Sequence, residues 1–416
     1  MKRKLARSIA LLAFAPLVLA QATPPPTLND VLRLTLQDDL MPALVLLEEV
    51  MEADPQASRT GAQYWSFSGD LATANELWVR GVDPPSGSLP DLSGLQALPA
   101  IEEIVRSAES ARVVIINEAH HSPRQRAFTH DLMLALRDVG FTHFAAETFC
   151  SGLHCGPLLV DGAPVGNAVT GFYTMEPVFG DLARQAEVAG YTLIGYEITP
   201  EQRAAFGADP NIDIRNYREL SQAENIKAVL DSDPELRILI HVGFGHVAES
   251  LPDAPLHVFA GRLKELTGED PLTIDQTQGT EQHGDHNSLL YRAYVSHFGA
   301  PAIPVAIPYG SERPSGTYRV DYGVIHPEQQ LINGRPDWLG MGGYRKPRVV
   351  PLQALGVRSL VRAFVVGEPE GAIAMDQMLV GPDAEAVTLM LPSGEYRLVR
   401  QTVMGENLPL GVIEIE

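Results

Sequence analysis

The sequence predicts an α/β protein with a mostly parallel β-sheet and flanking helices, preceded by a helical segment and followed by a small antiparallel β module. Two observations predict this class. Between residues 99 and 335, short apolar runs that suit buried strands alternate with helical stretches. Outside that range the pattern changes, because residues 23–98 carry helical periodicity and residues 336–416 carry short β runs separated by turns.

Residues 1–22 predict a secretory signal peptide. Four basic residues (Lys2, Arg3, Lys4 and Arg7) precede the apolar run "SIALLAFAPLVLA", and small residues follow it. No later stretch approaches the roughly 20 apolar residues that a membrane-spanning helix needs. We therefore expect a periplasmic or secreted protein with no integral membrane segment after signal removal.

The chain has two cysteines, Cys150 and Cys155, and they lie close together in "FCSGLHCG". In an exported protein such a pair predicts a local disulfide. A metal-binding pair is the alternative, and the absence of a second cysteine pair in the sequence counts against it.

The charge balance bears on the class of partner. The formal net charge is −21, and removal of the signal segment takes away four more positive charges. An acidic surface repels phosphate backbones, so we expect no nucleic-acid partner. The expected partner is a small-molecule or peptide substrate, which goes with the hydrolase hypothesis given below. Solubility alone also explains this acidity.

The segment 23–98 carries apolar residues at helical spacing, with breaks near Asp38 and around Gly69. Two helical pairs resemble a fragment of a tetratricopeptide array, although fewer than three repeats are visible. This segment is a candidate surface for a protein partner. The stretch "GVDPPSGSLPDLSG" then reads as a linker.

The central region begins with the apolar run "ARVVIIN", which suits a strand covered on both faces. Ser122 and Pro123 predict the start of a helix, Gly140 predicts its end, and "FTHFAAE" is the next strand. This order implies a parallel βαβ unit. The runs "YTLIGYE", "LRILIHV", "PLTIDQ" and "PAIPVAI" are further candidate strands. An open sheet and a closed barrel both fit this pattern.

Polar side chains that can carry chemistry stand at the ends of five predicted strands. They are Glu118, His120 and His121 after "VVIIN", Glu147 after "HFAA", Glu197 after "LIGY", His241 and His246 around "GFG", and Asp275 after "LTI". Ligands bind beyond the carboxyl ends of parallel strands, so these groups are expected on one rim. Singly, each has a structural explanation: Glu118 can cap the following helix, and His241 can be a hydrogen-bonded core residue. Their coincidence favours a functional site.

Histidine and carboxylate side chains on one rim support two kinds of chemistry. They can bind a divalent metal whose water becomes a nucleophile near neutral pH. They can also perform general acid–base catalysis without a metal, with a carboxylate holding an imidazole in the required tautomer. A nucleophilic serine is not indicated, because the sequence has no G-x-S-x-G motif.

Two stretches carry a resemblance to a known superfamily. "NEAHHSPRQRAF…LMLALRDVGFTHFAAE" and "RELSQAENI…LRILIHVGFGHVAE" resemble the superfamily that joins erythromycin esterases, ChaN-like haem-binding lipoproteins and Tiki-type metalloproteases. Its first motif is a Gly-Glu pair followed by a histidine. Here Asn117 stands in place of the glycine and Glu118 matches the acid. The esterases place the histidine where His121 stands, and the ChaN and Tiki groups place it where His120 stands.

The remaining motifs follow in the expected order. Glu147 matches the acid that ends the second strand in the esterases, and His246 matches the second histidine. Arg218 and Asn225 match an arginine and an asparagine two turns apart on the preceding helix. The resemblance spans roughly residues 110–250, so it leaves the flanking segments unexplained.

Three functions are open: the resemblance implies the first two, and the flanking helical and β segments motivate the third. The first is a secreted hydrolase of an ester or amide bond, with Glu118, His121, Glu147, His246 and Arg218 as catalytic residues. On the metal-assisted route, His120, His246 and Glu118 would hold zinc or manganese. The alternative is a periplasmic haem- or metal-binding protein of the ChaN type, and a scaffold without chemistry is the third.

Overall fold

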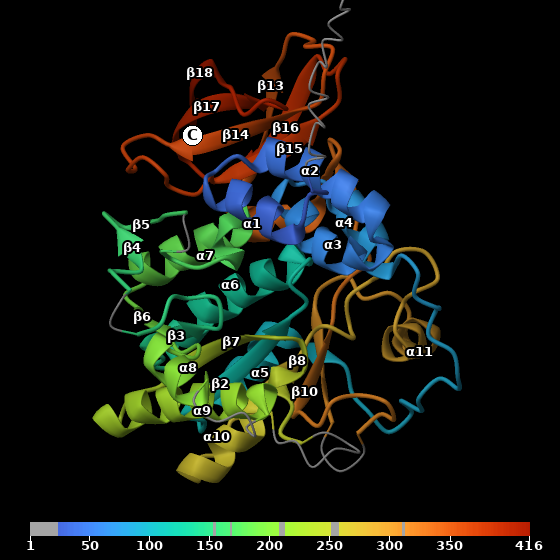
Figure 1. Ribbon diagram of the computed structural model, residues 1–416. Helices are drawn as coiled ribbons and strands as arrows, with labels where there is room; N and C mark the ends of the chain where they lie inside the picture. Colours follow the sequence, from blue (N-terminus) through green and yellow to red (C-terminus); the bar gives the residue numbers. More distant parts are fainter. Residues whose placement is uncertain (1–23, 153–154, 167–168, 208–212, 251–257, 310–312) are drawn as a thin grey trace, which may run out of the picture.

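The computed structural model describes residues 24–152, 155–166, 169–207, 213–250, 258–309 and 313–416 (Figure 1). The predicted signal peptide lies outside these residues. The predicted disulfide between Cys150 and Cys155 is present. In the described residues, none of the helices has the length and apolar character needed to cross a bilayer.

The fold class is confirmed: a mostly parallel sheet lies at the centre, with helices on both of its faces (Figure 1). In spatial order its strands are β1 (Leu98–Pro99), β9 (Val305–Pro308), β10 (Tyr322–Ile325), β8 (Leu272–Asp275), β2 (Val113–Glu118), β7 (Ile238–Gly243), β3 (His143–Ala146) and β6 (Thr192–Gly195). All neighbours from β10 to β6 pair in parallel, whereas β9 pairs antiparallel with both β10 and β1. The sheet is open, which settles the choice between sheet and barrel.

Side chains alternate along each strand, and in this sheet both sets are apolar, so helices cover both faces. One face packs on α5 (Ala100–Ala108), α6 (Pro123–Asp138) and α7 (Pro177–Val188), and the other on α9 (Ile214–Ser232), α10 (Phe259–Thr267) and α11 (Leu289–Phe298). On β2, Val114 and Ile116 enter the first core, and Val113 and Ile115 enter the second. The short α8 (Pro200–Gly207) precedes α9.

The chain reverses its direction across the sheet between β2 and β7. After β2, helix α6 leads over one face to β3, which is separated from β2 by β7. After β7, helix α10 leads over the opposite face to β8 on the other side of β2. Diverging connections of this kind open a crevice at the carboxyl ends of the two strands, where α/β proteins bind ligands.

Two flanking units pack against each other beside the sheet. The helices are α1 (Leu28–Leu36), α2 (Leu40–Ala53), α3 (Ser58–Phe67) and α4 (Leu71–Val79). The β module contains β13 (Lys346–Pro351), β14 (Ser359–Val365), β15 (Asp376–Val380), β16 (Ala386–Leu391), β17 (Gly394–Thr402) and β18 (Asn407–Ile415). Its four-stranded sheet, ordered β15-β14-β17-β18, is antiparallel.

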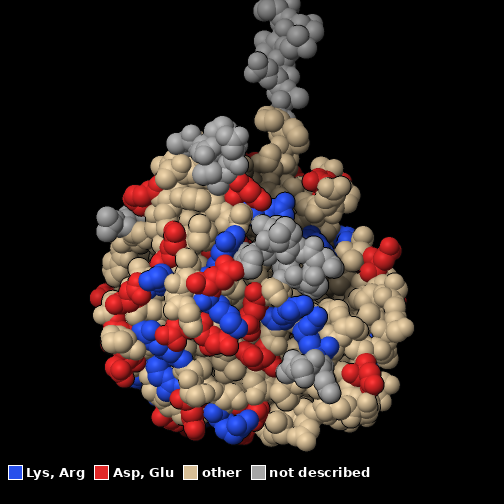
Figure 2. Space-filling model, turned by 90° about the horizontal axis from the view of Figure 1, so that it is seen from below, with Lys and Arg blue, Asp and Glu red and all other residues tan. Residues whose placement is uncertain are grey.

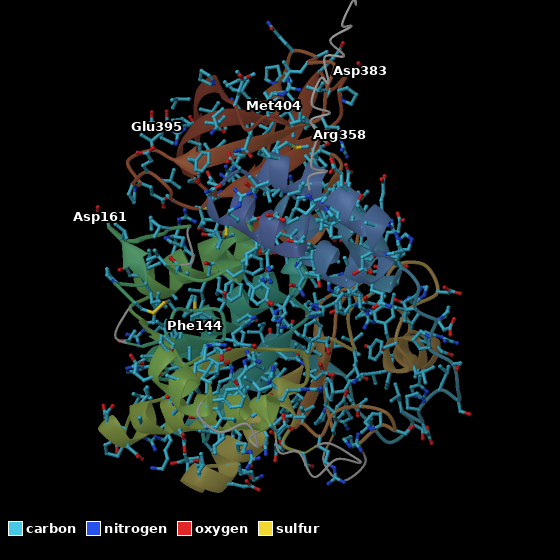
Figure 3. All side chains as sticks on the ribbon, in the orientation of Figure 1. Phe144, Asp161, Arg358, Asp383, Glu395 and Met404 are labelled. Atoms are coloured by element: carbon cyan, nitrogen blue, oxygen red, sulfur yellow. A yellow bond between two sulfur atoms is a disulfide. The ribbon has the colours of Figure 1, made fainter. Side chains whose placement is uncertain are left out.

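Ion pairs join these two units. Arg358 lies beside α2 in Figure 3 and donates to Glu48 at 2.8 and 2.6 Å. Arg362 donates to both carboxylate oxygens of Asp38, at 2.8 and 2.6 Å.

Short elements complete the fold. They are β4 (Leu159–Val160), β5 (Ala163–Pro164), β11 (Leu331–Ile332), β12 (Arg335–Pro336), η1 (Pro55–Ala57), η2 (Tyr173–Met175), η3 (Phe244–Val247) and η4 (Asp337–Gly343).

Charged side chains of both signs cover the face formed by α9 and α10, which Figure 2 shows from below. Local pairs such as Lys227 with Asp231, and Lys264 with both Glu249 and Asp270, account for part of this mixture. The acidic excess of the chain is therefore interspersed with basic groups on this face.

A fully buried ion pair ties the start of the β module to α7. Arg345 donates to Asp181 Oδ2 at 3.1 and 2.6 Å and to the Met375 carbonyl at 3.1 Å, and neither charged side chain reaches solvent. Removal of one partner leaves a buried charge without compensation, which costs about 3–5 kcal/mol.

We predict that Asp181→Ala lowers the free energy of unfolding by about 3–5 kcal/mol in urea titrations. The matched control is Asp231→Ala, which breaks the exposed pair with Lys227 and is expected to cost less than about 1 kcal/mol. Equal losses in the two variants would contradict the prediction.

Candidate active site

Glu118 ends β2 and is buried, with 1% of its surface exposed. Arg126, from the second turn of α6, donates to its two oxygens at 2.6 and 2.8 Å. The remaining capacity of the carboxylate is used by His120 Nδ1 at 2.8 Å and His241 Nε2 at 3.0 Å. Both oxygens of Glu118 are therefore committed to neighbouring side chains.

The charge of Arg126 keeps Glu118 ionised. Burial raises the pKa of Glu118, but the charge and hydrogen bonds of Arg126, with those of His120 and His241, hold it well below its ordinary value. Arg126 also donates to Glu176 at 3.1 Å and to the His120 carbonyl at 2.9 Å.

A second network surrounds Arg218, which projects from α9. Its Nε donates to the two oxygens of Glu197 at 3.0 and 2.9 Å, and its Nη2 donates to Glu147 Oε1 at 2.5 Å and also to Glu197. Gln222, one helical turn further along, donates to Glu197 at 3.0 Å. Arg218 thus holds together the acids that follow β3 and β6. Its side chain is 31% exposed, so the network reaches solvent.

His246 lies in η3, directly after β7. Its Nδ1 is 2.7 Å from Glu219 Oε1, and Glu219 is fixed in turn by the backbone N–H of Phe259 at 2.7 Å. Its Nε2 lies 3.4 Å from Arg218 Nη1 and 3.8 Å from Glu147 Oε1. Because a guanidinium can only donate, the hydrogen-bond network assigns the proton of the neutral ring to Nδ1.

The carboxylates around His246 favour its charged form. Burial alone would lower the pKa of His246, but the hydrogen bond to Glu219 and the charges of Glu147 and Glu219 outweigh burial and raise it above the ordinary value. The pKa of Glu147 falls to about 2: burial raises it, and the charges of His246, His120 and Arg218 more than reverse that effect.

The two networks meet at Gly243, the last residue of β7. Its N–H donates to Glu147 Oε2 at 2.6 Å. A methyl group added at Gly243 would lie 2.5 Å from His120 Cε1, 2.7 Å from His120 Nε2 and 3.0 Å from Glu147 Oε2. The absence of a side chain at Gly243 is what allows His120 and Glu147 to approach each other.

Aromatic rings fix the orientation of His120. Tyr173 stacks on the imidazole with ring centroids 3.9 Å apart, and Phe244 meets it edge-on at 4.9 Å. Phe244 has a positive φ of 43°, which is unfavourable for a residue with a side chain. Its carbonyl accepts a hydrogen bond from Asn117 Nδ2 at 2.8 Å.

The side-chain amide of Asn117, near the end of β2, links three strands. Nδ2 donates to Phe244 after β7 and, at 2.7 Å, to Asp275 at the end of β8. Oδ1 accepts the backbone N–H of Gln276 at 2.9 Å. The amide therefore braces the rim of the sheet.

His121 points away from the Glu118 carboxylate and lines a separate cavity. Its ring stacks on Trp78 of α4 with centroids 4.2 Å apart. Neither ring nitrogen has a hydrogen-bond partner among the described residues, and the side chain is buried. Burial, reinforced by the charges of His120 and Arg126, lowers the pKa of His121 to about 3, so the ring is neutral.

The structure thus brings together most of the residues that the sequence singled out. Glu118, His120, Glu147, Arg218 and His246 lie around Gly243, whereas His121 lies apart from them. Two other strand-end residues, Glu197 and His241, join these networks. Asp275 braces Asn117, and Asn225 holds the Tyr196 carbonyl at 3.0 Å.

Sequence reasoning missed Arg126, Glu176, Glu219 and Tyr173. One signal was available for Arg126: a cation near a helix N-terminus opposes the helix dipole and so calls for an anion close by. Nothing distinguishes Glu219 in the sequence, since it lies in a polar helix among other charged residues.

Hydrogen bonds to neighbouring side chains already occupy some of the candidate metal ligands. Both oxygens of Glu118 bind Arg126 and two imidazoles, so Glu118 has no free lone pair directed at a metal. His120 Nε2, His246 Nε2 and Glu147 are the remaining donors near Gly243. Among the described residues, no three histidine, cysteine or acidic side chains are grouped closely enough to hold an ion.

Together, the open parallel sheet and the cluster at its switch point define an α/β protein with a buried histidine–carboxylate site. No protein-family model and no curated protein matches the chain. Among solved structures, it is similar to the type III effector HopBA1 (17% identity, TM-score 0.30, 47% of this chain and 94% of HopBA1). It is also similar to RRSP, a MARTX toxin effector domain from Vibrio vulnificus CMCP6 (18% identity, TM-score 0.34, 62% of this chain and 57% of that one). These similarities are too low to carry an argument about function.

We predict that Gly243→Ala lowers the free energy of unfolding by about 1–3 kcal/mol, because the added methyl group displaces His120 or Glu147. The matched control is Gly381→Ala, where a methyl group would meet no atom within 4 Å; it is expected to change stability by less than about 1 kcal/mol. Urea unfolding measures both variants, and a neutral Gly243→Ala would show that the close approach is not required.

Proposed function

We propose that the protein is a secreted or periplasmic hydrolase of an ester or amide bond. The observation that carries the proposal is a pair of imidazoles, His120 and His246, each held at Nδ1 by a buried carboxylate. Glu118 holds the first at 2.8 Å and Glu219 the second at 2.7 Å. Each ring therefore presents Nε2 as its unprotonated nitrogen, which in His246 faces Arg218 Nη1 at 3.4 Å, and both rings flank Glu147.

The proposed reaction uses His246 as the general base. Neutral Nε2 takes a proton from water, the water oxygen bonds to the substrate carbonyl carbon, and the carbonyl oxygen becomes an anion. The protonated ring then returns the proton to the leaving alcohol or amine as the C–O or C–N bond breaks. Glu147, 3.8 Å from Nε2, stabilises the imidazolium in between.

Arg218 and Glu118 have supporting roles in this proposal. Arg218 Nη1 lies 3.4 Å from His246 Nε2, so the guanidinium can stabilise the oxyanion beside the base. Glu118 acts as a positioning residue, because its oxygens hold His120 in place and are not available to substrate.

Metal assistance stays a separate prediction. The predicted ligands His120, His246 and Glu118 do not form a ready site for zinc or manganese, because both Glu118 oxygens are engaged and no three donor side chains among the described residues are grouped closely enough. Elemental analysis of the purified protein distinguishes this route from metal-free catalysis.

Haem binding, the alternative from the superfamily resemblance, is tested by adding haemin and recording the Soret band. Binding of a protein partner by α1–α4 also stays a prediction.

We predict that His246→Ala lowers kcat/KM about 10²–10⁴-fold on whichever substrate of a panel of p-nitrophenyl esters and peptide amides the protein cleaves. His297→Ala, an exposed histidine on α11, is the control and retains full activity. Circular dichroism verifies that both variants are folded. Full activity in His246→Ala, or no cleavage of any member of the panel, would contradict the proposal.

The pH dependence gives a second prediction. Since neutral His246 is the base, kcat/KM rises with pH through a pKa above the ordinary 6.5 of histidine. Glu219→Gln removes the carboxylate that raises this pKa, so the rise shifts to lower pH. A rate profile with the same midpoint in both proteins would exclude the assigned role of Glu219, because a merely structural role would change the rate without moving the midpoint.

A further inference from the structure

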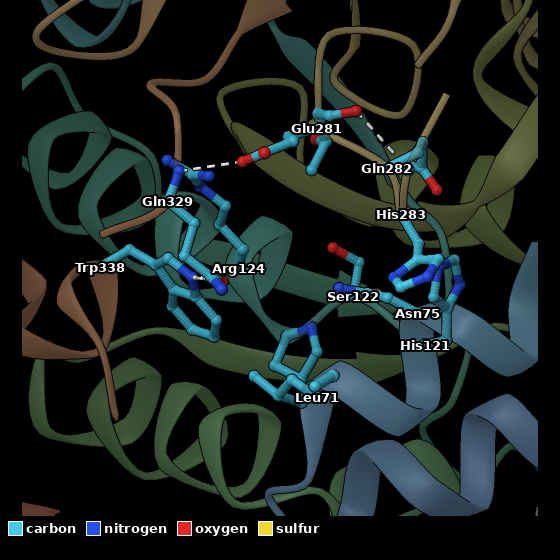
Figure 4. Close-up of a pocket in the computed structure, with 14 residues that line it drawn as sticks. Leu71, Asn75, His121, Ser122, Arg124, Glu281, Gln282, His283, Gln329 and Trp338 are labelled. Carbon is cyan, nitrogen blue, oxygen red and sulfur yellow. Dashed lines mark hydrogen bonds between the residues drawn. The ribbon is translucent and has the colours of Figure 1, made fainter. Parts of the chain in front are cut away.

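A cavity of about 260 Å³ lies between α4, the N-terminus of α6, the loop from β8 to α11 and η4 (Figure 4). Its lining combines residues that are distant in the sequence. They include Leu71, Asn75, His121, Arg124, His283 and Trp338. His283 is exposed and His121 and Arg124 are buried, so the cavity runs from the surface into the molecule.

Two buried side chains in this cavity have unused hydrogen-bonding capacity. Arg124 is only 7% exposed and makes no hydrogen bond or ion pair with any described residue, although Asp337 and Glu281 act on it at longer range. Both ring nitrogens of His121 likewise have no partner among the described residues. A guanidinium in such surroundings carries a large desolvation penalty, and burial lowers the pKa of Arg124 accordingly.

The position of Arg124 adds a second electrostatic cost to its desolvation penalty. Arg124 is the second residue of α6, a helix of 16 residues whose N-terminal dipole disfavours a cation. The N-cap residue Ser122 makes no side-chain hydrogen bond to the first turn. An anion in the cavity would satisfy the guanidinium and the helix N-terminus together.

The rest of the lining limits what the anion can be. Glu281 contributes a carboxylate whose Oε2 accepts the backbone N–H of Gln329 at 3.0 Å, so a highly charged ligand would be repelled. Leu71 and Trp338 offer apolar surface for a small body attached to the anionic group. The volume suits a small molecule, not a polymer.

We propose that this cavity is a second ligand site, which binds a small molecule through a carboxylate or a phosphate group held by Arg124 at the N-terminus of α6. His121 lies at the inner end of the site, where its ring stacks on Trp78 and both ring nitrogens are buried. The site is distinct from the Glu147–His246 cluster, because Trp78 and Phe244 stack on each other between His121 and His120.

The test uses tryptophan fluorescence, because Trp338 lines the cavity and Trp78 stacks on His121. The full-length mature protein is titrated at pH 7 with sodium phosphate and, separately, with sodium acetate, against sodium chloride at equal ionic strength. We expect a saturable change with at least one of the two oxyanions and none with chloride. Absence of saturation with both would overturn the proposal.

Two charge variants of the same cavity should move the affinity in opposite directions. Arg124→Gln weakens binding at least about tenfold, since hydrogen bonds to a charged group are lost. Glu281→Gln keeps an acceptor for the Gln329 N–H and removes the like charge, so binding becomes at least about twofold tighter. Unchanged affinity in Arg124→Gln, or weaker affinity in Glu281→Gln, would overturn the assignment; if Arg124→Gln does not fold, the sign of the Glu281→Gln effect decides.

His246→Ala separates this site from the proposed hydrolase activity. It removes the proposed base and leaves the cavity untouched, so phosphate or acetate affinity is expected to equal that of the wild type. Lost hydrolysis with retained binding supports both proposals. Retained hydrolysis with retained binding would remove only the proposed function, and loss of binding would show that the cavity is not an independent site.

Discussion

The ion pair between Glu118 and Arg126 organises the carboxyl edge of the central sheet. Both side chains are buried, so their desolvation is costly unless every lone pair and N–H group finds a partner. Glu118 accepts four hydrogen bonds, from Arg126, His120 and His241, and Arg126 also reaches Glu176 and the His120 carbonyl. The pair therefore fixes α6, β7 and the N-terminus of α7 relative to β2, and it sets the tautomer of His120.

The neighbouring network has a different balance of charge. Glu147, Glu197 and Glu219 surround Arg218 and His246, so the acids outnumber the permanent cation. The surplus raises the pKa of His246, so the surrounding carboxylates stabilise the imidazolium that forms when the ring accepts a proton. The two networks can lie in contact because residue 243 is a glycine. Any side chain there would separate Glu147 from His120. The Glu118–Arg126 pair is buried, whereas the side chains of Arg218 and His246 are partly exposed.

How far the sequence determines these features depends on the range of the interaction. Apolar runs and helix caps are local, so the strand at 113–118 and the helix starting at Pro123 were predictable, as was the fold class. The strand order was not, because β7 enters between β2 and β3 through packing that no local pattern encodes. The convergence of Glu118, Glu147 and His246 followed from their strand-end positions. The partners that set their protonation, Arg126 and Glu219, depend on tertiary contacts.

The opposite directions of His120 and His121 show why motif spacing alone could not choose between them. Successive residues in the β2–α6 turn face different sides, and the turn is fixed by hydrogen bonds from the Ala119 N–H to Gln125 and from the Ser122 N–H to the Ala119 carbonyl. The same divergence continues into α6. Arg124 and Arg126 are two residues apart, which is about 200° around a helix, so one faces the cavity and the other faces Glu118. A single strand-to-helix turn thus supplies His120 and Arg126 to the Glu118 network and His121 and Arg124 to the lining of the cavity, and the structure of the turn, not the order of its residues, decides where each side chain points.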